Sequence, residues 1–251
     1  MPDLVRQSRN AALASPGPGT AERRELKFVF PGPDPRTLRD VLRANARPVA
    51  YGDQRVSSVH SLYFDDHRLS SCRESIAGIP RRAKLRLRWY DEPFARETAF
   101  LELKRRNGWL IRKQRLALEL GLPLEELGFR GLLAGLDRCA EPEQVAWLGL
   151  RGLPTLLVDY QREHFIDRES DTRITLDWDV HCTAQTGARA PHRGAEATLA
   201  GLVIVEVKTP ATSAADVRRL LHPLAPRLAR CSKYVHGCSA TGLMDEHEVR
   251  V

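Results

Sequence analysis

The chain has 251 residues, of which 42% are hydrophobic and 28% charged, a composition typical of a soluble globular protein. No apolar run is long enough to span a membrane and no signal-peptide pattern opens the chain, so we expect a cytoplasmic protein. Five cysteines without CxxC spacing indicate reduced thiols rather than a zinc site or a disulfide framework. The net charge of +7 suggests a polyanionic partner.

The first quarter of the chain predicts two strands and two helices after a lead-in. Residues 1–21 are rich in Ala, Pro, Gly and Ser, and we expect them to be disordered. Strands are predicted at residues 25–30 and 57–64, with a helix at 35–46 between them and a short helix at 67–75 after the second strand.

Three adjacent antiparallel strands are predicted between Lys84 and Leu120, because charged and apolar residues alternate along each of them. Successive side chains of a strand point to opposite faces. The face shared by the charged residues carries Lys84, Arg86, Arg88, Glu102, Lys104, Lys113 and Arg115.

The pair Asn107-Gly108 predicts a two-residue type I′ hairpin between the second and third of these strands. That turn would place Lys104 opposite Ile111 and Glu102 opposite Lys113.

Two helices follow, at residues 124–136 and 141–150, and their leucines are interpreted as packing residues. Strands are predicted at 155–165, 173–177 and 202–208, with a loop at 183–200 before the last. A helix is expected at 213–228, then a basic segment at 230–234. Residues 241–251 are expected to form a polar tail.

Eight strands are therefore predicted, and at least six of them carry charge on one face and aliphatic residues on the other. An open sheet with its polar face in water is one explanation of this alternation. We favour an α+β fold in which an eight-stranded antiparallel β-barrel closes around a charged lumen and helices pack outside. Eight strands suffice to enclose one ligand, and closure removes the exposed strand edges.

A lumen of this kind needs an anionic occupant, because buried like charges repel one another. Its basic residues would be Lys27, Lys84, Arg86, Arg88, Lys104, Lys113, Arg162 and Lys208, offset in part by Glu25, Glu102, Asp177 and Glu206. A chain of phosphates suits this excess of cations, and the carboxylates could hold a hard divalent cation. Each charged residue taken alone would be read as a surface ion pair.

Short motifs also occur in a characteristic order. They are ELKF at 25–28, SLYFDD at 61–66, KLRLRWY at 84–90, LELK at 101–104, YQREHF at 160–165, ITLDWDV at 174–180, VIVEVK at 203–208 and SKY at 232–234. Together they resemble the VTC domain, the polyphosphate polymerase branch of the CYTH-like triphosphate tunnel metalloenzymes. The resemblance covers residues 22–240 as one domain.

This resemblance implies an eight-stranded tunnel that transfers the γ-phosphate of ATP to a growing polyphosphate chain with the help of Mn²⁺ or Mg²⁺. ATP and polyphosphate would be the partners, without nucleic acid. The phosphate-binding residues it implies are Lys27, Lys84, Arg86, Arg88, Lys104, Lys113, Arg162, Lys208 and Lys233. Arg86, Arg88 and Glu206 would serve catalysis, and Glu206 and Glu102 would hold the metal.

One departure is that the wider superfamily opens with Glu-x-Glu-x-Lys, whereas Arg23 stands at the first position here. That difference weakens a triphosphate-hydrolase or cyclase assignment. The alternatives left open are an inorganic or nucleoside triphosphatase of the same fold, and a polyphosphate-binding module without activity. Nucleic-acid binding is disfavoured, because the basic residues occupy alternate positions of the strands, beside carboxylates, and no aromatic platform for stacking bases accompanies them.

Overall fold

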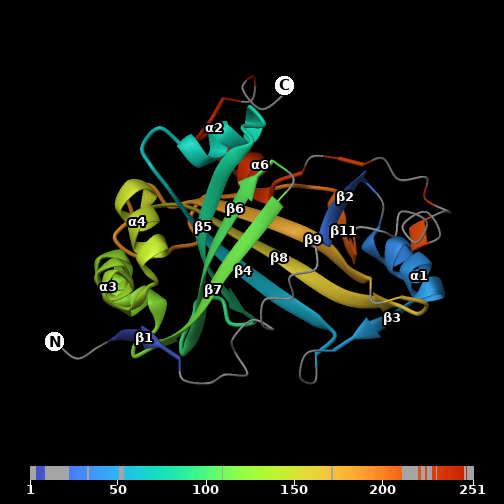
Figure 1. The fold of residues 1–251 in the computed structure, drawn as a ribbon, viewed down its shortest axis with the longest axis horizontal. Helices are drawn as coiled ribbons and strands as arrows, with labels where there is room; N and C mark the ends of the chain where they lie inside the picture. The colour runs from blue at the N-terminus through green and yellow to red at the C-terminus, as the bar shows by residue number, and fades with distance from the viewer. Residues whose placement is uncertain are drawn as a thin grey trace.

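The computed structural model describes residues 4–8, 23–32, 34–50, 54–108, 110–170, 172–210, 220–221, 224, 228–229, 231–245 and 247. Figure 1 shows one large antiparallel sheet with helices on both of its faces. The strands are β1 (Val5–Gln7), β2 (Arg23–Pro31), β3 (Ala46–Val49), β4 (Val56–Asp65), β5 (Arg81–Tyr90), β6 (Thr98–Asn107), β7 (Leu110–Leu120), β8 (Leu153–Asp167), β9 (Arg173–Ala184), β10 (Glu196–Thr198) and β11 (Leu202–Pro210). The helices are α1 (Pro35–Asn45), α2 (Ser70–Ile76), α3 (Leu124–Cys139), α4 (Pro142–Arg151) and α6 (Lys233–Ala240).

All eight predicted strands are present, and they are neighbours in the sheet. The strand order is β1-β7-β6-β5-β4-β8-β9-β11-β2, while β3 pairs with β8 and β10 pairs with β9. The fold is therefore α+β and antiparallel, as the alternating pattern predicts.

The prediction of a closed barrel is wrong for the part of the chain that the structure describes, because β7 and β2 do not pair with each other. Other segments occupy the two edges instead. Strand β1 pairs with residues 118–120 of β7. At the other edge the backbone nitrogen of Ala229 donates to the carbonyl oxygen of Lys27, and Leu228 bridges Phe28. Both edges thus gain hydrogen bonds without closing on each other.

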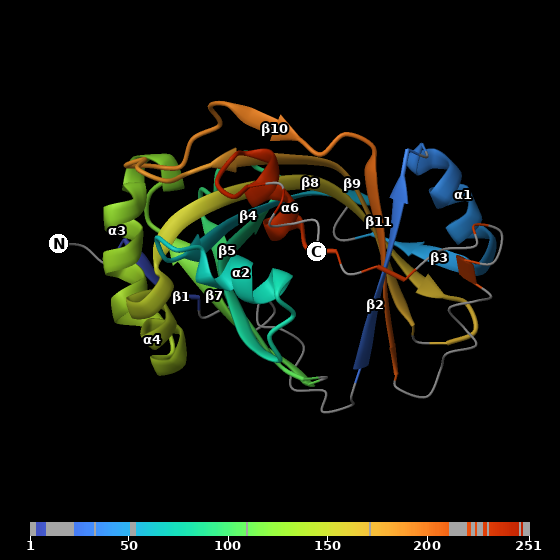
Figure 2. The ribbon, with the colours of Figure 1, turned by 90° about the horizontal axis from the view of Figure 1, so that it is seen from above.

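The aliphatic face of the sheet forms two cores under helices, as expected. Leu85, Leu87 and Trp89 of β5 are buried with residues of α3, and Trp147 and Leu148 of α4 pack against the same core. A second core joins the sheet to α1 and includes Leu38, Leu42, Leu176, Val205 and Val207. Figure 2 shows α3 and α4 at one end of the sheet and α1 at the other. Helix α3 is interrupted at Gly128, whose φ is 65°.

The expectation that all helices pack outside is wrong for α6, which lies on the charged face, and for α2, whose Cys72 is buried in the same cluster as Tyr63 and Tyr234. Tyr234 and Val235 of α6 are buried with Val158 and Tyr160 of β8, which share a face with Arg162. Helix α6 approaches β8 and β9 closely at Gly237, where a Cβ atom would lie 2.6 Å from Leu156 Cδ2 and 2.7 Å from Cys182 Sγ. A larger residue would clash there.

The register of the β6–β7 hairpin differs by two residues from the predicted one. Asn107 pairs with Leu110, so Lys104 lies opposite Lys113 and Glu102 opposite Arg115. The turn begins at Gly108, which has a φ of +59°, whereas the Asn107-Gly108 pattern predicts that it begins one residue earlier, at Asn107. A shift of two residues keeps every side chain on its predicted face.

Both ends of the chain contain more structure than expected. Val5–Gln7 forms β1 within the predicted disordered lead-in. Met244, within the predicted tail, is buried against α2, where Cys72 Sγ lies 3.7 Å from its Sδ. Most of the helix predicted at 213–228 lies outside the described residues, although Leu220 and Leu221 are helical. None of the helices that the structure describes is both long and apolar enough to cross a membrane.

Candidate functional site

One face of the sheet carries a large cluster of charged residues, most of them buried or half-buried, and we call it the basic trough. Its residues are Lys27, Lys84, Arg86, Arg88, Lys104, Lys113, Arg115, Arg162, Lys208 and Lys233, with the carboxylates Glu25, Glu102, Asp177 and Glu206. The sheet is curved, because Lys104 of β6 reaches Glu25 of β2 at 2.9 Å although five strands separate them in the sheet order. The segment before α6 also crosses the trough, since Lys84 donates to Ser232 and Lys27 to the carbonyl oxygen of Cys231.

At the β5–β7 side of the trough, Glu102 is the common partner of four cations. Its carboxylate lies 2.7 Å from Arg86, 2.6 Å from Lys113, 3.5 Å from Arg115 and 3.8 Å from Arg88. Burial opposes ionisation of Glu102, but Arg86, Arg88 and Lys113 hold its pKa well below the usual range. One buried carboxylate therefore neutralises only part of the surrounding charge.

Hydroxyl groups fix the two arginines of β5. Arg86 donates to the hydroxyl of Tyr63 at 3.0 Å, while Arg88 donates to Ser61 at 3.1 Å and to Tyr160 at 3.0 Å. Burial raises the pKa of Tyr63, but Arg86, Arg88 and Lys84 outweigh it and lower that pKa to about 8. These hydroxyls orient the guanidinium groups without adding negative charge. Glu102 is shared among four cations and offsets only part of the charge of Arg86 and Arg88, so both arginines are positioned to take an anionic ligand.

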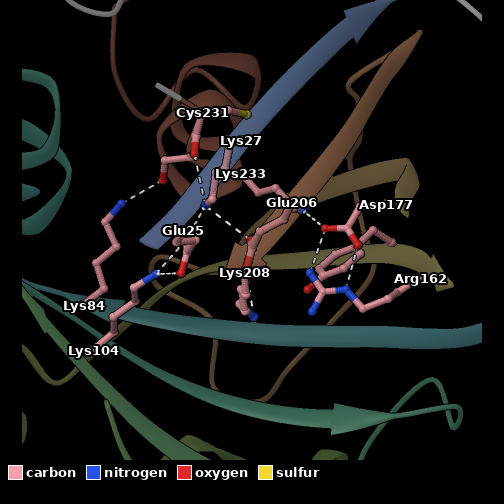
Figure 3. Close-up of polar contacts among 12 residues, drawn as sticks. Glu25, Lys27, Lys84, Lys104, Arg162, Asp177, Glu206, Lys208, Cys231 and Lys233 are labelled. Atoms are coloured by element: carbon pink, nitrogen blue, oxygen red, sulfur yellow. Dashed lines mark hydrogen bonds and ion pairs between the residues drawn. The ribbon is translucent and has the colours of Figure 1, made fainter. Parts of the chain in front are cut away.

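At the β2–β11 side, Glu25 and Glu206 share Lys27. The Lys27 Nζ lies 3.3 Å from Glu25 and 3.7 Å from Glu206, and Figure 3 shows both carboxylates facing it. Burial and the neighbouring Glu206 oppose ionisation of Glu25, but Lys104 and Lys27 lower its pKa to about 2. Burial likewise opposes ionisation of Glu206, but Lys208 and Lys27 keep its pKa well below normal. Both carboxylates are therefore ionised.

The third group centres on Asp177 of β9, which is fully buried. Arg162 binds it through two hydrogen bonds of 2.6 and 2.7 Å, and Lys233 of α6 donates to it at 2.5 Å. Burial raises the pKa of Asp177, but Arg162 and Lys233 outweigh it and lower that pKa strongly. Asp177 thus anchors the start of α6 to the trough (Figure 3).

Two lysines of the trough titrate near neutral pH. Burial, together with the charges of Lys27 and Lys104, lowers the pKa of Lys84 to about 8. Burial also lowers the pKa of Lys113 to about 7, even though Glu102 is adjacent. The Lys113 side chain is 41% exposed, so solvent screens its charge, and Lys84 is the stronger contributor. Both lysines would regain full charge beside an anion.

We expect the affinity of the trough for tripolyphosphate to fall about three- to tenfold between pH 7 and pH 9. The free protein loses the charges of Lys84 and Lys113 over this range, whereas a bound polyanion raises their pKa values and keeps them protonated. Binding therefore takes up protons and weakens as the pH rises. Isothermal titration calorimetry in two buffers of different ionisation enthalpy measures both the affinity and the proton uptake.

The matched variant is Lys84→Met, which removes the titrating ammonium and keeps the aliphatic stem. Ionisation of the ligand itself is the same for both proteins, so the difference between their pH profiles reports Lys84. A variant with the same proton uptake at pH 8 as the wild type would contradict the prediction.

Whether the trough suits a divalent metal can be judged from its oxygen donors. No three His, Cys, Asp or Glu residues gather into a metal-binding group within the described ranges. Glu25 and Glu206 nevertheless offer two ionised carboxylates on paired strands, beside cations that suit phosphate. Mg²⁺ is commonly held by one or two carboxylates together with substrate phosphates. The donor set fits a metal that arrives with a phosphate ligand.

All of the residues singled out from the sequence lie on this face. Arg86, Arg88, Glu102, Lys104 and Lys113 gather around β5–β7, and Lys27, Arg162, Glu206, Lys208 and Lys233 gather around β2, β9 and β11. Lys84 connects the two groups through Ser232. The hydroxyl partners Ser61 and Tyr63 were not predicted, although SLYFDD contains both and strand alternation places them on the charged face.

The model of the VTC domain family matches residues 22–127 and 144–241. No curated protein matches the chain. Among solved structures, the chain is similar to the PH1819 protein from Pyrococcus horikoshii OT3, at 15% identity and a TM-score of 0.43, over 85% of this chain and 97% of that chain. It is also similar to a "putative adenylate cyclase" from Vibrio parahaemolyticus, at 9% identity and a TM-score of 0.37, over 80% of this chain and 83% of that chain. Both TM-scores are below 0.5, so neither likeness supports a conclusion about this chain.

Proposed function

The chain belongs to the VTC domain family, and from that premise we propose that it is an ATP-dependent polyphosphate polymerase. It would transfer the γ-phosphate of ATP to the end of a growing polyphosphate chain within the basic trough. The catalytic domain would span residues 22–240.

The observation that carries this proposal is the excess of fixed cations over carboxylates in the trough. Glu102, Glu25, Glu206 and Asp177 each contact two or more basic side chains. Lys84 donates to the Ser232 hydroxyl, which carries no charge. Such a surface is completed by a ligand that carries several negative charges in a row. A polyphosphate chain has this property, and its oxygens match arginine and lysine donors.

In the proposed reaction the side chains bind and orient phosphates rather than form covalent bonds. Arg86 and Arg88, fixed by Tyr63, Ser61 and Tyr160, would hold the γ-phosphate and stabilise charge on it during transfer. The attacking group would be the terminal phosphate of an existing chain. Lys27, Lys84 and Lys104 would hold the phosphates that flank the reacting one.

We propose Glu206 and Glu25 as the ligands of a divalent metal. When bound there, Mn²⁺ or Mg²⁺ would withdraw charge from phosphate oxygens. Glu102 was expected to share this role, but its carboxylate is already surrounded by Arg86, Lys113 and Arg115. We assign Glu102 to positioning these cations instead.

Incubating the purified protein with ATP and Mn²⁺ tests the proposal directly. We expect ADP release together with a ladder of polyphosphate on a gel, and both should require the metal. Polyphosphate formation distinguishes transfer to a chain from transfer to water.

Two outcomes would contradict the polymerase. Orthophosphate release from tripolyphosphate without polymer would identify a triphosphatase. Tight polyphosphate binding without ATP turnover would identify a binding module.

A further inference from the structure

The basic residues of β5 and β6 continue beyond the trough toward the end where β6 turns into β7. Arg82 pairs directly with Arg106, next to the pair of Lys84 and Lys104. Because side chains two residues apart share a face, Arg82 and Arg106 lie on the same face as the trough. Arg106 donates to the carbonyl oxygen of Gly108 and Arg82 to that of Ile79, so both side chains lie at the end of their strands near the β6–β7 turn.

The trough is more exposed toward this end than at Arg88. Side-chain exposure is 6% for Arg88 and 20% for Arg86, and it is 36% for Lys104 and 41% for Lys113, which face each other one level nearer the turn. Arg82 and Arg106 are half-buried, and Asn107 at the turn is exposed. At the opposite end of the same strands the face becomes apolar, with Phe100 and Ala117 buried and Tyr90 packed edge-on against Phe100. The line of cations is therefore closed by aromatic residues at one end and open at the other.

We propose that the open end of β5, β6 and β7 is the exit of the trough, and that Arg82 and Arg106 bind the outgoing part of a linear polyphosphate chain. This inference rests on the proposed function and adds the direction in which the product chain leaves the trough. At about 3.3 Å per residue, Arg82 lies about 20 Å along the strand from Arg88. A ligand of three phosphates held at Arg86 and Arg88 is too short to reach Arg82 and Arg106, whereas a longer chain reaches them.

The test compares the variant Arg82→Glu/Arg106→Glu with the wild type by measuring affinity for two probes, tripolyphosphate and long-chain polyphosphate. We expect at least a tenfold loss of affinity for the long chain and less than a twofold change for tripolyphosphate. With ATP and Mn²⁺, the products should become shorter while the initial rate of ADP release stays within twofold. The binding measurements need no turnover, so they test whether Arg82 and Arg106 bind long-chain polyphosphate even if the protein shows no polymerase activity.

The matched control is Arg81→Glu/Arg112→Glu, which makes the same change of charge at the same end of the sheet, on β5 and β7, but on the opposite face. An equal loss of long-chain affinity in the control would show a general effect of charge and would overturn the assignment of the exit to Arg82 and Arg106. Unchanged long-chain affinity in Arg82→Glu/Arg106→Glu would overturn it as well. If the glutamate variant fails to fold by circular dichroism, Arg82→Gln/Arg106→Gln takes its place, and the same two comparisons decide with a smaller expected loss of about threefold.

Discussion

Replacing Glu102 with glutamine is expected to lower the free energy of unfolding by about 3–5 kcal/mol. The carboxylate is 1% exposed and is the common partner of Arg86, Arg88, Lys113 and Arg115. Glutamine has the same shape but no charge, so the four cations would repel one another in a buried place. At about 2–4 °C per kcal/mol, the melting temperature should fall by roughly 10 °C in a phosphate-free buffer.

The same variant should be rescued by an anionic ligand. Tripolyphosphate would restore the missing negative charge, so it should raise the melting temperature of Glu102→Gln more than that of the wild type. The control is Glu92→Gln, because Glu92 is 63% exposed and its ion pair with Arg96 is worth at most about 1 kcal/mol. If Glu102→Gln melts like the wild type, Glu102 does not hold the cations together.

The strands and their faces could be predicted because alternation has a period of two and each strand repeats it. The register of β6 and β7 could not, since Asn107-Gly108 is compatible with turns that begin at either residue, and Asn107 pairs with Leu110. The sequence pattern also left the partners of Glu102 undetermined. They depend on which strands are neighbours and on how far each side chain extends across the face.

Closure of the sheet was predicted wrongly because its edges are covered by short segments with little sequence signal. Val5–Gln7 and residues 228–229 add only a few hydrogen bonds each, and nothing in their composition marks them as edge partners. Helix α6 was missed for a similar reason. It is eight residues long, and its clearest signals are the N-cap Ser232 and the small Gly237, which only the packed structure explains.

The variant Glu206→Gln is expected to reduce polyphosphate synthesis at least 100-fold while strengthening metal-free binding of tripolyphosphate about two- to fivefold. The two effects have opposite signs because the proposed assignment gives Glu206 two roles. As the proposed metal ligand, its charge would be needed to hold the divalent ion beside the phosphates. Without metal, its negative charge faces the same phosphates and competes for Lys27 and Lys208, which contact it at 3.7 and 2.9 Å.

A purely structural role for Glu206 would weaken polyphosphate synthesis and metal-free tripolyphosphate binding together. We would separate this role from metal binding by titrating Mn²⁺ in the synthesis assay and by measuring metal-free binding with calorimetry. The matched control is Glu163→Gln, a carboxylate that is buried more deeply, at 1% exposure against 11% for Glu206, and that pairs with Arg39 and Arg43 on the opposite face of the sheet. This control removes a buried charge without touching the trough, so its Mn²⁺ dependence should equal that of the wild type. If Glu206→Gln synthesises polyphosphate at the wild-type rate and with the wild-type Mn²⁺ dependence, the metal is held elsewhere. A neutral amide cannot replace the charge of the Glu206 carboxylate as a metal ligand.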